Sequence, residues 1–210
     1  MTTTNRSKIL RSAAGLFALA VVLLNPIQSH AQTTQTLVNY YTGAALTISS
    51  SPMDGMPLVS SVFMPLSVPP AQRWAFEIDP NGTQNNVKIW TISSTVGSLK
   101  VADVSSHFTW DTITPVVQAT KLERKGDGIT FDCNRVGCIS TPWKFQRWTQ
   151  ISTPFVSGVV HYFLFQNFAT KSCMTDLGSP AIGGAVIQTP CDYSPRQLWA
   201  VLNNSTGRFD

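Results

Sequence analysis

The chain is poor in charge. Only 12% of its 210 residues are Asp, Glu, Lys or Arg, and Glu77 and Glu123 are its only glutamates. The motifs of common enzymes are also missing, since it contains no G-x-S-x-G, no glycine-rich phosphate loop and no H-E-x-x-H. Two carboxylates from distant segments, as glycoside hydrolysis uses, are the arrangement that the sequence leaves open. We therefore expect a protein without catalytic activity or cofactor, with a small hydrolase as a distant alternative.

Long helical and long apolar segments are absent from the part after residue 31. No stretch there is long enough for a transmembrane helix, and no long segment has helical periodicity. Short apolar runs separated by Pro and Gly instead predict strands. They lie at residues 58–63, 87–92, 116–119, 158–165 and 185–188. The chain is expected to be all-β and to form one domain.

The first 31 residues have the pattern of a secretory signal peptide. Three basic residues precede a 12-residue apolar stretch at 13–24, and small residues up to Ala31 supply a cleavage site. A lipoprotein anchor is not expected, because no cysteine follows the apolar stretch. Residues 32–210 are then the mature domain, released into a periplasm or the medium after cleavage near Ala31.

Removing this leader also removes most of the positive charge. The whole chain has 15 Lys and Arg against 11 Asp and Glu, and three of the basic residues lie in the leader. Residues 32–210 are left with 12 basic and 11 acidic residues. Nucleic acid is therefore not an expected partner.

Three Gln-x-Trp tripeptides divide the mature domain into comparable segments. They lie at residues 72–74, 146–148 and 197–199, and they predict a threefold repeat over about residues 37–80, 87–150 and 158–202. A gap-free alignment of the repeat starts puts Leu46, Leu99 and Met174 in one column. Such tryptophans bury a large apolar area, and the glutamine amide can bond backbone in the same turn. The expected core and scaffold residues are Trp74, Trp148, Trp199, Gln72 and Gln146.

The middle repeat is longer than the others by roughly 20 residues, which predicts an insertion at residues 121–142. Cys133 and Cys138 lie within it, whereas Cys173 and Cys191 flank the body of the third repeat. Four cysteines in an exported chain imply disulfides, and local pairing is the simplest of three connectivities. A metal site is not expected, because paired C-x-x-C ligands are absent and His107 and His161 are the only mature histidines.

The third repeat resembles the ricin B-type lectin family. The resemblance covers about residues 37–202. It is strong in repeat three, at residues 173–175, 184–191 and 196–199, and weak in the middle. It implies a β-trefoil, a barrel of three repeats capped by hairpins, which is secreted and binds galactose-like or other glycans in shallow pockets. The Cys173–Cys191 pair matches the disulfide found within such repeats.

The sugar-binding positions of that family are altered here. The acceptor Asp, two residues after the first Cys, is replaced by Thr175, and its predicted counterparts are Thr47 and Lys100. Thr189 replaces the aromatic residue that the family has two positions before the second Cys. The Asn before Gln-x-Trp is replaced by Ala71, Phe145 and Arg196. Tyr offers a stacking face and Arg offers planar donors, so repeat three is still the predicted sugar site. The candidate residues are Thr175, Asp176, Thr189, Tyr193, Arg196 and Gln197.

Aromatic residues on turns suggest a second contact surface, for a protein partner. The candidates are Tyr40, Tyr41 and Phe168, and packing against neighbouring hairpins is the alternative. The disulfide-bearing insertion with Trp143 is a further candidate, as a protein-docking arm, and a rigid decoration is its alternative. Residues 43–47 and 72–80 resemble the A and C subunits of cytolethal distending toxins. That resemblance implies a subunit that binds a host surface and holds a separate catalytic subunit.

Two histidines complete the candidates. His107 lies in a Ser-rich turn and is expected to be solvated, and His161 is expected to be a strand-edge residue bonded to backbone. The leading hypothesis is a secreted lectin-like trefoil whose partners are glycans or glycoproteins at a cell surface. The second is a binding or scaffold subunit of a bacterial toxin, partnered by other secreted subunits. A trefoil protease inhibitor is a remote third.

Overall fold

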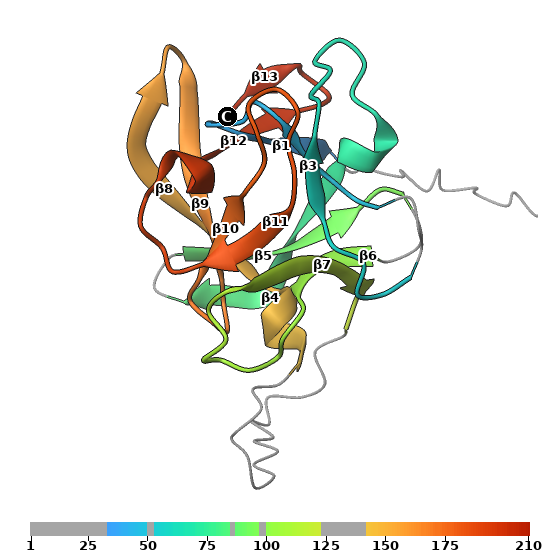
Figure 1. The fold of residues 1–210 in the computed structure, drawn as a ribbon, viewed down its shortest axis with the longest axis vertical. Helices are drawn as coiled ribbons and strands as arrows, with labels where there is room; N and C mark the ends of the chain where they lie inside the picture. The colour runs from blue at the N-terminus through green and yellow to red at the C-terminus, as the bar shows by residue number, and fades with distance from the viewer. Residues whose placement is uncertain (1–32, 50–52, 85–86, 97–99, 123–141) are drawn as a thin grey trace, which may run out of the picture. The chain divides into compact units, whose positions relative to one another are not determined.

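The computed structural model describes residues 33–49, 53–84, 87–96, 100–122 and 142–210. The leader, Leu99, the Cys133–Cys138 pair and most of the insertion at 121–142 lie outside the described residues. Residues Gln32–Asp210 form one compact unit, which is built almost entirely of strands (Figure 1). Within the described ranges, no helix is long and apolar enough to cross a membrane.

Six antiparallel strands close into a barrel. Each pairs with the next around the ring, and the last pairs again with the first, so the barrel has no free edge. In ring order they are β1 (Thr34–Asn39), β4 (Trp74–Gln84), β5 (Val87–Ser94), β8 (Trp148–Ser157), β9 (Val160–Asn167) and β12 (Trp199–Asn203).

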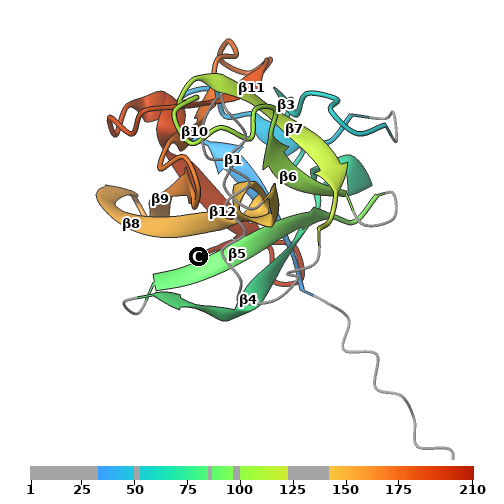
Figure 2. The ribbon, with the colours of Figure 1, turned by 90° about the horizontal axis from the view of Figure 1, so that it is seen from below.

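Three hairpins cap one end of the barrel. Figure 2 shows them on the upper side, away from β4, β5 and β8. They are β2 (Ala45–Thr47) with β3 (Val59–Ser61), β6 (Lys100–Val104) with β7 (Thr114–Thr120), and β10 (Cys173–Asp176) with β11 (Val186–Thr189). Strand β11 pairs with β7, and bridges join Pro57 to Val117 and Val59 to Ala185. A short strand, β13 (Arg208–Phe209), pairs with β12. The five predicted strands all overlap observed ones.

Each repeat ends in a 3₁₀ turn that leads into a buried tryptophan. The turns η1 (Pro70–Gln72), η2 (Pro142–Gln146) and η3 (Pro195–Gln197) all begin with Pro, whose fixed φ and missing N–H suit a first helical position. Trp74, Trp148 and Trp199 are 0% exposed. Their indole N–H groups donate at 3.0 Å to the carbonyls of Leu46, Ala102 and Met174. Burial of these rings, with Leu37, Ile92 and Phe165, forms the core.

These bonds correct the predicted alignment of the middle repeat. The carbonyl that accepts from Trp148 belongs to Ala102, not to Leu99. The counterpart of Thr47 and Thr175 is therefore Asp103, and not Lys100. The predicted column is three residues too early for two reasons. The alignment starts the middle repeat at Ile92, whereas Ser94 is the residue opposite Trp74 in the barrel. Ala102 also follows Ser94 by eight positions, and each other repeat spans seven. A gap-free alignment cannot accommodate that difference.

Candidate functional site

The Gln-x-Trp glutamines fasten each cap hairpin to the turn that ends its repeat. In repeat three, Gln197 Nε2 donates to the Pro190 carbonyl at 2.8 Å, and its Oε1 accepts from the Asp192 N–H at 2.9 Å. In repeat two, Gln146 makes the same pair of bonds with the Thr120 carbonyl at 3.0 Å and the Leu122 N–H at 2.8 Å. The two repeats thus share one scaffold, against which their site residues can be compared.

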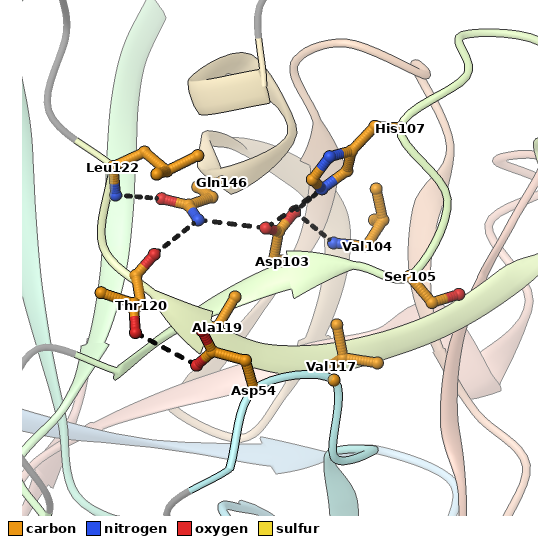
Figure 3. A pocket seen from close by; sticks show the side chains of 11 residues that line it. Asp54, Asp103, Val104, Ser105, His107, Val117, Ala119, Thr120, Leu122 and Gln146 are labelled. Atoms are coloured by element: carbon orange, nitrogen blue, oxygen red, sulfur yellow. Dashed lines mark hydrogen bonds and ion pairs between the residues drawn. The ribbon is translucent and has the colours of Figure 1, made fainter.

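Repeat two adds a carboxylate to this scaffold. Gln146 Nε2 also donates to Asp103 Oδ2 at 3.0 Å, where Gln197 donates to the Thr189 hydroxyl. Asp103 accepts from the Val104 N–H at 2.7 Å, and His107 Nε2 lies 3.2 and 3.3 Å from its two oxygens (Figure 3). The residue is only 2% exposed, so its charge is held by directed donors and not by bulk water.

Asp103 lies in a pocket of about 520 Å³, a volume that suits a small-molecule site. Figure 3 shows the pocket between the β6–β7 hairpin and a loop that carries Asp54. Backbone bonds from Gly55 N–H to the Gln118 carbonyl and from Gln118 N–H to the Met56 carbonyl, both 2.9 Å, hold that loop in place. The lining residues are Asp54, Gly55, Asp103, Val104, Ser105, His107, Val117, Ala119, Thr120, Leu122 and Gln146.

The wall opposite Asp103 carries a second, neutralised carboxylate. Lys100 forms an ion pair with Asp54, and the Thr120 hydroxyl donates to the same carboxylate at 3.1 Å. The hydrogen bond from the Lys100 ammonium lowers the pKa of Asp54, although partial burial opposes this. Lys100, predicted to stand in the acceptor column, is instead the counter-ion of a residue at the pocket rim.

His107 is partly exposed to solvent, as the sequence predicted, but it also contacts two neighbouring side chains. Its ring stacks on that of Phe145, with centroids 4.9 Å apart and planes 18° apart. Its side chain is 37% exposed, and Nε2 is directed at Asp103. Phe145 stands where the lectin family has an Asn. The pocket therefore lacks that amide and has instead the His107 ring, which stacks on the ring of Phe145. His107 and Asp103 were both missed as site residues, because the insertion before Trp148 hides the register of this hairpin in the sequence.

The pocket can accept a hydroxyl and support an apolar face. A carboxylate has about four acceptor positions. Three donors contact Asp103, and His107 Nε2 lies within range of both oxygens, so a ligand hydroxyl that donates to this carboxylate would share or displace the contact of His107. The Thr120 hydroxyl and the free edge of His107 add polar contacts, while Val117 and Ala119 supply apolar surface. Within the described ranges, no group of His, Cys, Asp and Glu could hold a metal ion.

In repeat three, the predicted sugar-binding residues are bonded to one another. The Thr175 and Thr189 hydroxyls lie 2.7 Å apart, and Gln197 Nε2 donates to Thr189 at 2.8 Å. The Cys173–Cys191 disulfide is present and closes this repeat. These hydroxyls therefore already satisfy each other and the glutamine.

Asp176, the other predicted acceptor, faces inward. It is 0% exposed, and its carboxylate accepts from the Thr42 hydroxyl at 2.6 Å, the Ser60 hydroxyl at 2.8 Å and the Gly178 N–H at 2.7 Å. It thus ties repeat three to repeat one. Gly183 must be glycine beside this junction, because a Cβ there would lie 2.3 Å from the Ser60 carbonyl and its φ is +82°.

Tyr193 and Arg196 lie nearer the surface. The Arg196 guanidinium lies 4.3 Å from the centre of the Tyr41 ring and donates to the carbonyls of Asp176 and Gly178, both at 2.9 Å. Tyr193 is 48% exposed. The structure thus brings together Tyr41 and Arg196, which the sequence assigned to a partner surface and to a sugar site respectively.

The remaining partner candidates differ in their surroundings. Tyr40 is 50% exposed and meets Tyr162 edge to face at 4.9 Å. Phe168 is half-buried, and the Lys171 ammonium lies 4.4 Å from the centre of its ring. The side chain of Trp143 lies outside the described residues.

Neither protein-family models nor curated proteins match the sequence. Solved structures do match. The designed threefold-symmetric protein ThreeFoil superposes with a TM-score of 0.55 at 18% identity, over 80% of this chain and 96% of that one. A lectin from Polyporus squamosus, solved with Neu5Aca2-6Galb1-4GlcNAc, superposes with a TM-score of 0.50 at 14% identity. That match covers 82% of this chain and 49% of the lectin, so this chain spans about half the lectin's length.

The chain is a β-trefoil. The closed barrel, the three caps and the superpositions agree on this fold, as the ricin-type resemblance implied. A chain of the Haemophilus ducreyi cytolethal distending toxin also matches, with a TM-score of 0.48 at 15% identity, over 81% of this chain and 83% of that one. At such identities the likeness is one of fold, and what the trefoil binds has to be argued from its own residues.

Proposed function

We propose that this trefoil is a secreted, non-catalytic lectin whose binding site is the pocket of repeat two. The observation that supports this proposal is Asp103. It is held by the Gln-x-Trp glutamine of its own repeat, at the position that the ricin-type resemblance assigns to the sugar-accepting carboxylate. It also lines a pocket, with a histidine ring beside it.

A sugar ring suits this pocket for two reasons. One ring hydroxyl can donate to Asp103, a charge-assisted bond that is stronger than one between neutral groups. The C–H face of the ring can then lie on the apolar surface of Val117 and Ala119. A site of one carboxylate and a small apolar face gives weak affinity for each copy, so binding to a cell surface would depend on avidity.

A glycan array probed with the purified, oxidised protein, followed by two matched variants, tests this proposal. Asp103→Asn removes the charged acceptor and keeps the side-chain shape, so binding should fall about tenfold or more, the equivalent of losing one charge-assisted hydrogen bond. Arg196→Ala changes the site predicted from sequence in repeat three and should leave binding intact. Thermal unfolding of both variants confirms that they are folded.

The outcomes separate the two repeats. Loss of glycan binding in the Asp103→Asn variant alone supports the repeat-two site. Loss of glycan binding in the Arg196→Ala variant alone would indicate that the site lies in repeat three. Absence of binding by the well-folded wild type would refute the lectin proposal.

A binding subunit of a toxin-like assembly is the second candidate. Tyr40, Tyr41 and Tyr193 are each 44–50% exposed, and Arg196 stacks on Tyr41. Tyr and Arg are enriched at protein interfaces, so this group favours a protein partner over a purely structural role. Co-purification with another secreted polypeptide, lost on Tyr41→Ala, would support it. Purification of the protein alone from its native secretion would speak against it.

A further inference from the structure

An exposed pair of aromatic rings lies on the loop that contributes Ser105 and His107 to the repeat-two pocket. Phe108 and Trp110 are 36% and 53% exposed, and they stack on each other with centroids 4.9 Å apart and planes 25° apart. Among the tryptophan side chains that the structure describes, Trp110 is the most exposed. Exposed Trp forfeits its hydrophobic stabilisation, so the core does not account for this residue.

The pair belongs to the same loop as the pocket. Residues 105–113 connect β6 to β7, and Ser105 and His107 of this loop line the pocket. Phe108 directly follows His107 in the chain. The aromatic pair thus follows directly along the chain from a residue of the pocket. The pocket itself has no aromatic residue on its strand, because Ala119 stands where the lectin family has one.

The loop is held in one conformation by buried polar groups. The Ser106 hydroxyl donates to the Asp111 carboxylate. Gln188, which is 0% exposed, donates through Nε2 to the Asp111 carbonyl at 2.8 Å and to the Thr114 hydroxyl at 2.9 Å. A Trp on a loop fixed in this way loses little conformational entropy when a ligand binds, as a preorganised binding surface requires.

We propose that the Phe108–Trp110 pair is a second subsite, which stacks on the next ring of a glycan whose terminal sugar occupies the Asp103 pocket. The ligand class is then an oligosaccharide of at least two residues, and not a monosaccharide. This inference rests on the proposed function. A flat π-face suits the C–H face of a sugar ring.

Binding of methyl glycosides and of disaccharides with the same terminal sugar, measured by calorimetry, tests the subsite. Trp110→Ala should lower disaccharide affinity by roughly two- to twelvefold, the range of an aromatic stacking contact, and leave methyl-glycoside affinity unchanged. Trp110→Phe should restore most of the disaccharide affinity. Leu66→Ala, which removes an apolar side chain that is fully exposed in repeat one, serves as the control and should change neither affinity.

The outcomes distinguish the subsite from the pocket. If Asp103→Asn abolishes binding while Trp110→Ala leaves both ligands unaffected, the subsite is wrong and the pocket stands. Equal losses for monosaccharide and disaccharide in Trp110→Ala would also overturn the subsite, because the effect would then come from the pocket itself. If wild-type protein binds none of these saccharides, both proposals fail together.

Discussion

The Gln-x-Trp glutamines are not equivalent in the structure, and this inequality predicts unequal effects of one substitution. Gln197 satisfies two backbone groups, the Pro190 carbonyl and the Asp192 N–H. Gln72 donates to the Val62 carbonyl at 2.9 Å, but its buried Oε1 has no partner among the described residues. Replacing each glutamine by methionine keeps the side-chain length and removes the carboxamide.

The expected magnitudes follow from the groups left unpaired. A buried polar group without a partner costs about 1–3 kcal/mol. Gln197→Met leaves two backbone groups unpaired, and because water can reach their exposed residues we expect a loss of about 2–4 kcal/mol. Gln72→Met leaves the Val62 carbonyl unpaired, but it also removes the side-chain oxygen Oε1, which was itself unpaired. Because these two changes largely offset each other, we expect a loss of stability of about 0–2 kcal/mol.

Thermal and urea unfolding of the two variants, side by side, measures this difference. A gap of about 2 kcal/mol corresponds to about 4–8 °C in Tm for a domain of this size. The urea m-value should be unchanged in both variants, because neither alters the surface exposed on unfolding. Equal destabilisation, or a larger effect at Gln72, would refute the reasoning that unpaired groups set the cost.

Two further predictions concern the disulfide and acid stability. Replacing both Cys173 and Cys191 by Ala should lower stability by about 3 kcal/mol, because the bond closes a loop with a sequence separation of 18; a drop in Tm of less than about 2 °C would contradict this. Burial raises the pKa of Glu77, but hydrogen bonds from Lys121 and Ser93 outweigh it and leave that pKa below its ordinary value of 4.5. Its stabilisation is therefore present above pH 4.5 and lost as pH falls through the folded pKa, so Glu77→Gln should flatten the acid side of the stability–pH curve. Parallel wild-type and variant curves, measured by thermal unfolding, would contradict this.

The fold could be predicted from sequence because its signal is repeated. Each Gln-x-Trp marks a turn beside the core, and burial of a Trp ring with a bonded N–H leaves little freedom in how the chain passes that point. Trp148 is therefore buried in the core in the same way as Trp74 and Trp199, although the residues between the three tripeptides differ from repeat to repeat. The strand at 116–119 was likewise predictable, since its apolar run lies within β7.

The site could not be predicted in the same way, because the pocket draws on three separate segments. Asp54 comes from the first cap, Asp103 from the second, and Gln146 from a turn that follows the insertion. Only the fold brings them together. An alignment that started two residues too early, together with one extra residue after Ser94, also concealed that Asp103 occupies the acceptor column.

The sequence resemblance to the lectin family and the proposed binding site lie in different repeats of this trefoil. Repeat three has the cysteine pair that matches the family, but its Thr175 and Thr189 hydroxyls are hydrogen-bonded to each other. The carboxylate of Asp176 accepts hydrogen bonds from repeat one instead of facing a pocket. Repeat two resembles the family least, yet it keeps a carboxylate bonded to the Gln-x-Trp glutamine. A buried carboxylate costs free energy unless donors are arranged around it, and no packing demand requires one at that position, where Thr47 and Thr175 serve in the other repeats. Asp176 shows that a buried carboxylate with three donors can serve the fold alone, so what distinguishes Asp103 is the pocket that it lines. The Asp103→Asn variant is therefore the sharpest test between a lectin and a scaffold.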